Sequence, residues 1–328
     1  MNLVLTTFGT YLHRNGEMFV IKVKEEKKEI SSRKVRSILI TTGASLSTDA
    51  IQLAISRNID IVFLDQNGQP YGRVWHGKLG STTAIRREQL RFADTSEGVE
   101  LAKTWIIRKL DNQINYLTSA RQKRTRLSST LTDKIDGLEK LVAKITNLSG
   151  SLNEIRGSIL GLEGKAGAIY WQAVNILLPE RYQFKERSRN PAKDEFNCLI
   201  NYAYGVLYGT VERAAILAGL DPYVGFIHTD HYNKKSFVFD LIEPYRIWAD
   251  ETVVGLFAAR KVTMGMFDKL HNGFLLNKEG KAVLMDRFEH FLDESIRYNN
   301  RNVQRRETVQ LDCHVIANQL LENVNETD

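Results

Sequence analysis

Residues 159–170 read ILGLEGKAGAIY and form the centre of an apolar pattern at helical spacing over 154–178. Within 157–179 the only charged residues are Glu163 and Lys165. A carboxylate in an apolar segment costs free energy unless it is paired or binds a metal. Glu163 is therefore a candidate ligand, and the alternative is a helix-surface acid paired with a lysine. The glycines around it, expected to let other backbones approach closely, are Gly161, Gly164 and Gly167.

The residues on both sides of this stretch predict a large helical region. Only five prolines occur in the chain, which agrees with a helix-rich remainder. The further patterns at helical spacing cover 101–117, 135–148, 194–218, 244–271, 281–297 and 307–323.

The first 76 residues instead predict β-structure. Asn15-Gly16 is a pair favoured in tight hairpin turns. Ser47 is expected to cap a short helix, and the charged residues 24–28 are expected to form a solvated loop. The β-prone runs are 3–7, 10–13, 18–23, 35–40, 59–64 and 71–75.

Together these patterns predict an α+β protein, with a small β-rich N-terminal domain followed by a larger all-α catalytic domain. We expect the β-rich domain to cover 1–78, a linker to cover 79–95 and the helical domain to cover 96–328. A length of 328 residues is ample for two domains.

Composition points to a soluble protein of a reducing cytoplasm. Hydrophobic residues make up 43% of the chain, and no run reaches the roughly 18 apolar residues of a membrane helix. The N-terminus lacks the basic and cleavage regions of a signal peptide. Cys198 and Cys313 form no framework of disulfides or metal ligands. The net charge of +6 permits a polyanionic partner without establishing one.

Three more residues lie in apolar segments where a polar group needs an explanation. His228 ends the run VGFIH at 224–228, and Asp240 and Glu243 lie within SFVFDLIEPYR at 236–246. His228 as a satisfied core or surface histidine is one alternative. Asp240 as the N-cap of a helix, with Glu243 paired to a nearby arginine, is another.

Glu163, His228 and Glu243 would together supply two carboxylates and one imidazole. Such a mixed set of oxygen and nitrogen ligands suits a divalent ion that keeps positions open for water and phosphate. Mg²⁺ or Mn²⁺ is the ion that this hypothesis predicts.

Basic residues recur on both sides of these candidate ligands, as DNA chemistry would require to screen and hold a polyanion. Each basic run taken alone is typical of a solvated face. The candidate phosphate contacts are Arg187, Arg189, Lys234, Lys235 and Arg246.

Four ordered motifs resemble those of the CRISPR adaptation integrase, the first-named CRISPR-associated endonuclease. They are LGLEGKAG at 160–167, NPAKDEFNCLINYAY at 190–204, GLDPYVGFIH at 219–228 and SFVFDLIEPYR at 236–246. The helix that carries 109–113 also resembles this family. Lys234-Lys235 replaces the family's usual Gly-Arg, and Phe237 replaces its Leu, so a positive charge is kept.

The resemblance implies that Glu163, His228 and Glu243 bind the metal and that Asp240 is a supporting acid in the catalytic site. It also implies a homodimer held through the N-terminal domain. Two such dimers would assemble with the small second-named CRISPR-associated protein into a heterohexameric integration complex. The expected nucleic acids are double-stranded fragments, repeat DNA and branched DNA.

The function expected on these grounds is metal-dependent phosphoryl transfer on DNA, in which the 3′-hydroxyl of a captured fragment attacks repeat DNA. One alternative is a phosphoesterase acting on small phosphate esters, although no Walker-type glycine loop is present. The other is a non-catalytic DNA-binding scaffold, which explains the charge but not the acids and histidine in apolar segments.

Overall fold

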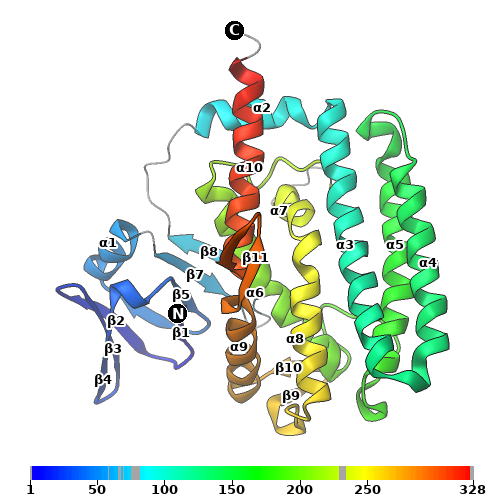
Figure 1. The fold of residues 1–328 in the computed structure, drawn as a ribbon. Helices are drawn as coiled ribbons and strands as arrows, with labels where there is room; N and C mark the ends of the chain where they lie inside the picture. Colours follow the sequence, from blue (N-terminus) through cyan, green and yellow to red (C-terminus); the bar gives the residue numbers. More distant parts are fainter. Residues whose placement is uncertain are drawn as a thin grey trace.

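The computed structural model describes residues 2–57, 59–65, 68, 70–74, 82–228 and 234–325. A β-rich N-terminal part lies beside a larger, mostly helical part, as the sequence predicts (Figure 1). The predicted linker lies outside the described residues at 79–81, and helix α2 (Thr82–Phe92) occupies most of its remainder. Trp75, expected to end the last strand of the N-terminal part, also lies outside them.

Two four-stranded sheets build the N-terminal part, in the orders β1-β5-β7-β8 and β4-β3-β2-β6. In the first sheet, β1, β5 and β7 run parallel and β8 is antiparallel. In the second sheet, β2, β3 and β4 form an antiparallel meander and β6 runs parallel to β2. The elements are β1 (Asn2–Leu5), β2 (Thr10–Asn15), β3 (Met18–Val23), β4 (Glu26–Ser31), η1 (Ser32–Lys34), β5 (Ser37–Ile40), β6 (Ala44–Leu46), α1 (Thr48–Ser56), β7 (Asp60–Leu64) and β8 (Pro70–Val74).

Local sequence signals of this part are confirmed with one exception. Gly16 adopts a φ of 57° in the hairpin between β2 and β3, which explains the glycine there. The Ser47 side chain accepts a hydrogen bond from the backbone N–H of Ala50, as expected of a cap. The loop predicted at 24–28 is confirmed only at Lys24 and Glu25, which form a turn, because β4 begins at Glu26 and pairs with β3. This edge strand is mostly exposed, so charged side chains cost it little.

The helical part is built from long helices that pack side by side (Figure 1). Its helices are α2 (Thr82–Phe92), α3 (Ser96–Lys123), η2 (Thr125–Leu127), α4 (Ser128–Thr146), α5 (Leu152–Leu177), η3 (Glu180–Tyr182), α6 (Glu195–Leu217), α7 (Ser236–Leu241), η4 (Glu243–Tyr245), α8 (Arg246–Ala258), η5 (Met264–Met266), α9 (Lys278–Asp293) and α10 (Arg305–Asn325).

Two short antiparallel hairpins interrupt the region that the sequence predicts to be all helical. They are β9 (Phe267–Leu270) with β10 (Gly273–Leu276), and β11 (Ser295–Tyr298) with β12 (Arg301–Gln304). The pattern predicted over 244–271 therefore ends early, at Ala258, and Arg260 follows with a φ of 54°. A positive φ cannot continue a right-handed helix, and this residue ends α8.

The first sheet is covered on both faces, which places the two parts of the molecule in direct contact. Ile38, Ile40 and Ile61 belong to the core of the N-terminal part. Leu39 and Val62, which alternate with them, belong to the core of the helical part. Because successive side chains of a strand point to opposite faces, one sheet serves both cores. The apolar run at 59–64 is thus a buried strand, as predicted.

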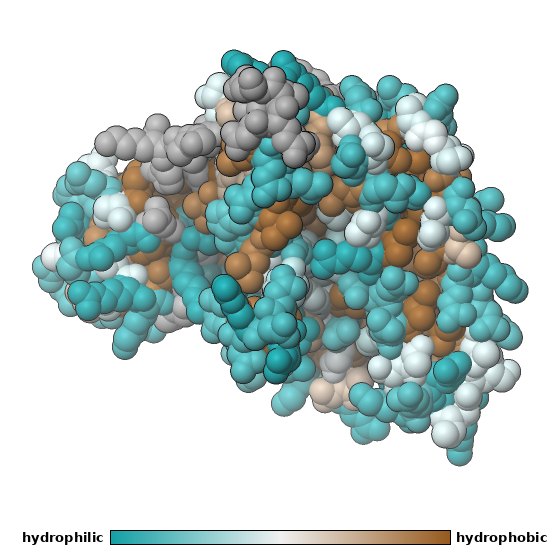
Figure 2. All heavy atoms as spheres, turned by 45° about the horizontal axis from the view of Figure 1, so that its top comes forward, coloured by the Kyte–Doolittle hydropathy of each residue, from teal (hydrophilic) through white to brown (hydrophobic). Residues whose placement is uncertain are grey.

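The face of the molecule drawn in Figure 2 is largely hydrophilic, with hydrophobic residues visible mainly between the polar ones. Among the described residues, no helix combines the length and the apolar character that crossing a membrane requires. Cys198 and Cys313 are both buried and carry free thiols.

Candidate metal centre

Glu163 lies near the middle of α5, a helix that begins with a capping box formed by Ser151 and Glu154. The close backbone approach expected at the neighbouring glycines is wrong. A Cβ added at Gly161, Gly164 or Gly167 would meet no atom within 4 Å. Gly164 and Gly167 instead line the cavity into which Glu163 faces, so their missing side chains leave space there.

Lys109 of α3 joins the two candidate glutamates. Its ammonium pairs with Glu163 and lies 2.6 Å from Oε2 of Glu243. Burial by itself lowers the pKa of Lys109, but the charges of Glu243 and Glu163 outweigh burial and raise it. The lysine is therefore a buried cation whose charge is compensated by two carboxylates from separate segments of the chain.

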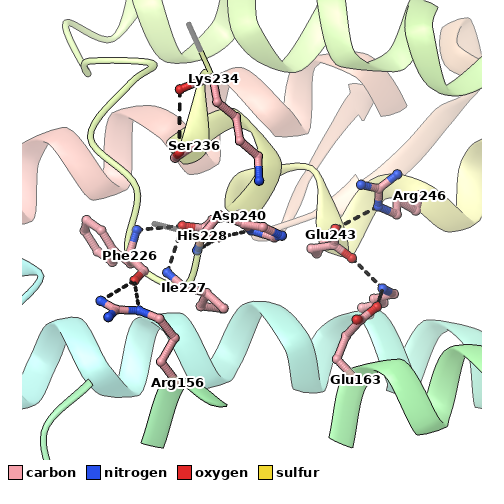
Figure 3. Close-up of polar contacts among 11 residues, drawn as sticks. Arg156, Glu163, Phe226, Ile227, His228, Lys234, Ser236, Asp240, Glu243 and Arg246 are labelled. Atoms are coloured by element: carbon pink, nitrogen blue, oxygen red, sulfur yellow. Dashed lines mark hydrogen bonds and ion pairs between the residues drawn. The ribbon is translucent and has the colours of Figure 1, made fainter. Parts of the chain in front are cut away.

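Glu243 is held at the start of the short helix η4. The side-chain amide of Asn112 on α3 donates a 2.8 Å hydrogen bond to the carbonyl oxygen of Pro244 and so ties η4 to α3. Nε of Arg246 lies 2.8 Å from Oε1 of Glu243 and donates a hydrogen bond to it. The guanidinium of Arg246 also lies 4.9 Å from the centre of the Tyr204 ring. Figure 3 shows Arg246 on one side of Glu243 and Glu163 on the other.

Glu243 stays ionised despite being almost completely buried, at 4% exposure. Burial by itself raises the pKa of this carboxyl group. The positive charges of Arg246 and Lys109, and the hydrogen bonds from both, more than reverse that effect and lower its pKa to about 2. The carboxylate is therefore available as an anionic ligand across the physiological pH range.

Asp240 of α7 fixes the backbone that carries His228. Its buried carboxylate accepts hydrogen bonds from the backbone N–H groups of Phe226, Ile227 and His228, at 2.6, 3.0 and 3.0 Å. Its Oδ1 also lies 2.6 Å from Nδ1 of the His228 ring (Figure 3). A side chain of Arg156 on α5 donates to the carbonyl oxygen of Phe226 and holds the same turn from the opposite side.

These contacts correct one of the alternatives raised by the sequence. Asp240 lies inside α7 and does not cap its N-terminus, where Lys235 stands. Burial raises the pKa of Asp240, and the His228 ring and the backbone donors oppose that rise. When Asp240 is ionised it can only accept, so Nδ1 of His228 carries the proton and Nε2 keeps the lone pair that a metal requires.

Gly225 makes this turn possible. A Cβ added there would lie 2.5 Å from both the carbonyl oxygen of His228 and the Cβ of Ser236. Only glycine lets the histidine segment approach the start of α7 so closely.

Glu163, His228 and Glu243 all line one cavity of about 610 Å³. Within the described part of the chain, six cationic side chains and three carboxylates line this cavity. The cations are Lys109, Lys185, Arg187, Arg189, Lys234 and Arg246, and the acids are Glu163, Glu186 and Glu243. The lining therefore has an excess of positive charge, which favours an anionic occupant.

The predicted phosphate contacts differ in how freely they can reach such an anion. Arg189 is exposed at the cavity, and the ammonium of Lys234 lies 5.3 Å from the centre of the Phe239 ring. Arg187 binds Asn197 and Asn201 and lies over the Trp171 ring at 4.8 Å. Lys235 does not line the cavity.

Lys235 points instead to α6, where its ammonium lies 2.5 Å from Glu212. Arg246 is engaged with Glu243 in the same way. Of the five predicted contacts, the structure thus brings four to the cavity and turns Lys235 away from it.

The chemical types of the three candidate ligands fit a divalent metal, but their side chains do not meet at one point. Among the residues that the structure describes, no three His, Cys, Asp or Glu side chains stand close enough together to hold an ion. The ammonium of Lys109 lies against both glutamates. Oε2 of Glu243 is buried and has the Lys109 ammonium, 2.6 Å away, as its counter-charge. A buried carboxylate oxygen that already faces a cation is suited to binding a metal ion in its place.

Lys109 is the member of the centre that sequence reasoning missed as a functional residue. The signal was available, because Lys109 lies in the helical pattern of apolar residues around Ile106 and Leu110. A lysine on the buried face of a helix requires a compensating acid. The acids that compensate it lie 54 and 134 positions later in the chain, and their proximity depends on the tertiary fold.

Comparison with known proteins identifies the relatives of this fold. Residues 3–290 match the family model described as CRISPR associated protein Cas1. The CRISPR-associated endonuclease Cas1 1 of Archaeoglobus fulgidus is 32% identical over 92% of this chain and 91% of its own length.

Two solved structures share the fold over nearly the whole chain. A Cas1 protein from Thermotoga maritima superposes with a TM-score of 0.83 and 22% identity, covering 98% of this chain and 97% of that one. A casposase bound to its integration product superposes with a TM-score of 0.84 and 23% identity, covering 98% and 91%.

Proposed function

This chain belongs to the Cas1 family of CRISPR-associated proteins, and we propose that it is a metal-dependent DNA endonuclease and integrase. It inserts captured foreign DNA fragments into a CRISPR array and so serves adaptive antiviral defence. The relative from Archaeoglobus fulgidus, at 32% identity, carries the name of an endonuclease. The observation that carries the proposal is that two glutamates and a histidine from separate segments line one cation-rich cavity.

Glu163, His228 and Glu243 are the proposed ligands of Mg²⁺ or Mn²⁺. When bound, such an ion supplies Lewis-acid activation of the phosphorus and stabilises charge on the leaving oxygen. Asp240 positions His228 and fixes the tautomer that leaves Nε2 as the ligand atom. Arg246 holds the carboxylate of Glu243 in place through the hydrogen bond from its Nε.

The proposed reaction is a transesterification. The 3′-oxygen of the captured fragment forms a new bond to a phosphorus of the repeat DNA, and the bond from that phosphorus to its own 3′-oxygen breaks. One phosphodiester replaces another, so cutting and joining occur in a single step. If water takes the place of the 3′-hydroxyl, the same centre hydrolyses DNA. The reverse reaction resolves a branched intermediate.

Two cations near the centre, one exposed and one partly exposed, are the proposed contacts for the DNA backbone. Arg189 and Lys234 line the cavity without an acidic partner at ion-pair distance in the described residues. Arg187 and Arg246 already have partners within the site. They would attract the DNA by their charge more than by direct contacts with its phosphates. Lys235 is assigned a lesser role, because its ammonium already pairs with Glu212.

The proposed assembly follows from membership of the family. The protein forms a homodimer through its N-terminal part, residues 1–78, and two dimers bind the small protein Cas2 to form a heterohexamer. Double-stranded fragments, repeat DNA and branched DNA are the proposed nucleic-acid partners.

Substitution Glu163→Gln tests the role of the centre. It removes one ligand charge while keeping the shape of the side chain, so Mn²⁺-dependent cleavage of a labelled duplex should fall at least about 100-fold, within the range for loss of a key electrostatic group. The variant should stay folded, with a thermal unfolding midpoint lowered by the loss of the charge opposite Lys109. Glu139→Gln, an exposed substitution on α4, serves as the control. Full cleavage activity in Glu163→Gln would remove this residue from the site.

Competition experiments separate this function from its rivals. A phosphoesterase acting on small esters would be inhibited by mononucleotides as well as by long DNA, whereas the proposed enzyme should respond to long DNA alone. A scaffold without catalysis would show no difference between the wild type and Glu163→Gln.

A further inference from the structure

The ammonium of Lys109 lies where the two candidate glutamate ligands face each other. It contacts both Glu163 and Glu243, and the lysine is only 8% exposed. Since Arg246 also pairs with Glu243, two carboxylates and two cationic side chains lie together. Their formal charges sum to zero, and the anionic ligands are thus already compensated before any metal binds.

A second observation concerns the whole cavity. Its described lining holds six cationic side chains against three carboxylates. A dication entering alone would add positive charge to a site that already has an excess, and it would have to approach the buried ammonium of Lys109. In a partly desolvated site such repulsion is much stronger than in water.

A DNA phosphate changes this balance, because its negative charge compensates both the dication and the surrounding lysine and arginine side chains. We propose that Lys109 occupies the position between the two glutamates in the metal-free protein and thereby couples metal binding to the binding of DNA phosphate. Metal would bind weakly to the free protein and tightly to the DNA complex. By linkage, metal would raise the affinity for DNA by the same factor. This inference rests on the proposed function.

Lys103 provides a natural comparison within the same helix. It is 4% exposed, pairs with Glu100 at 2.8 Å and donates to the carbonyl oxygen of Leu148. It is a buried lysine of α3 with an acidic partner, but it does not line the cavity. A purely structural role for Lys109 predicts that both lysines behave alike towards metal.

The first measurement uses the wild-type protein. Free Mn²⁺ is measured by electron paramagnetic resonance during titration, with and without a saturating short duplex whose 3′-dideoxy ends cannot act as nucleophiles. We expect the duplex to tighten Mn²⁺ binding about tenfold or more, within the usual range of coupling between sites. Equal affinity in both titrations would overturn the proposal. Absence of Mn²⁺ binding in both would instead contradict the proposed metal-dependent function.

The second measurement compares Lys109→Met with Lys103→Met. Without DNA, Lys109→Met should bind Mn²⁺ about tenfold more tightly than the wild type, because the competing charge is gone. The gain on adding duplex should shrink, and Mn²⁺ should raise the melting temperature of Lys109→Met more than that of the wild type. Lys103→Met should match the wild type in Mn²⁺ affinity. Unchanged or weaker Mn²⁺ binding by Lys109→Met, or the same change in both variants, would overturn the proposal.

Discussion

The carboxylate of Asp240 organises the histidine side of the centre. It is completely buried, accepts from three consecutive backbone N–H groups and lies 2.6 Å from Nδ1 of His228. Loss of its negative charge would leave several buried donors poorly satisfied, which costs more than the net value of the bonds themselves. The residue therefore links local stability to the orientation of the imidazole.

Substitution Asp240→Asn tests this role. An amide keeps one acceptor oxygen but presents an NH₂ group where backbone donors point, so we expect the free energy of unfolding to fall by about 2–4 kcal/mol. Mn²⁺ affinity should fall about tenfold or more, as is usual when a partner of a metal-binding histidine is lost. Chemical denaturation and metal titration measure the two effects, with exposed Asp136→Asn as the control. Wild-type values for both would contradict this account of Asp240.

At the residue scale, the sequence identified polar residues that are unexpected within apolar segments. Glu163, His228 and Glu243 are polar groups in apolar segments, and the structure places all three on one cavity. The sequence could not indicate which residues each of them would contact. Lys109 was missed, and Lys235 was expected beside the DNA although it pairs with Glu212 on another helix. Pairings of this kind depend on distances between elements that are remote in the sequence.

At the scale of elements, a buried polar cluster joins three helices of the catalytic part. Asp250 of α8 accepts hydrogen bonds from the hydroxyl groups of Tyr170 on α5 and Tyr204 on α6, at 2.9 and 2.6 Å. Tyr170 is completely buried and therefore serves the core. Because Tyr204 also lies against Arg246, the cluster supports the segment that carries Glu243.

The cluster predicts a pH dependence of stability. Burial raises the pKa of Asp250 from its ordinary value of 3.8 to about 6, although the two tyrosine hydroxyls oppose the rise. A carboxyl group with a raised folded-state pKa stabilises the fold below its unfolded-state pKa, and this contribution is lost as the pH rises through about 6. Relative to Asp250→Asn, the free energy of unfolding of the wild type should fall by about 2 kcal/mol between pH 4 and pH 7.

Denaturant titrations of both proteins across this pH range make the comparison. Other ionisable groups cancel in the difference between wild type and variant. Parallel curves for the two proteins would contradict the raised pKa of Asp250.

Most elements of the fold could be predicted from periodicity and local signals, and the failures share one cause. The spacing of apolar residues located α3, α5 and α6, because each buries one face in the core. Strand β4 was missed because its formation depends on pairing with β3 and hardly on its own charged side chains. The early end of α8 was missed because apolar residues beyond it, Val262 and Met266 before the hairpin β9–β10 and Phe267 within it, join the core without an α-helix.

At the scale of the whole molecule, a chain of charges connects the N-terminal part with the segment next to the centre. Arg73 of β8 lies 3.6 Å from Asp60 of β7 and 3.2 Å from Glu212 of α6. Glu212 in turn pairs with Lys235, the residue directly before α7. Arg73, Asp60 and Glu212 are all largely buried, with side chains at most 10% exposed. The contact between the two parts is therefore fixed by charge as well as by the shared sheet.

Substitution Arg73→Met should lower the free energy of unfolding by about 3 kcal/mol, because it leaves two buried carboxylates short of their shared cation. The matched control is Arg57→Met. Arg57 belongs to the same part of the chain but pairs with Glu17 at an exposed site, so its loss should have a much smaller effect. Urea titrations measure both. Equal effects of the two substitutions would contradict the claim that Arg73 stabilises the contact between the N-terminal and helical parts.

The central claim is that this chain joins DNA fragments at the centre formed by Glu163, His228 and Glu243. The most direct test is a strand-transfer assay with Cas2 present, a labelled duplex with free 3′-hydroxyl ends and a supercoiled plasmid that carries a repeat array. Wild type, His228→Ala and the exposed control His290→Ala are compared with Mn²⁺ or EDTA.

We predict Mn²⁺-dependent joining of the label by the wild type and by His290→Ala, and a loss of at least about 100-fold in His228→Ala, the scale expected when a catalytic group is removed. Equal joining by the wild type and His228→Ala would contradict the account.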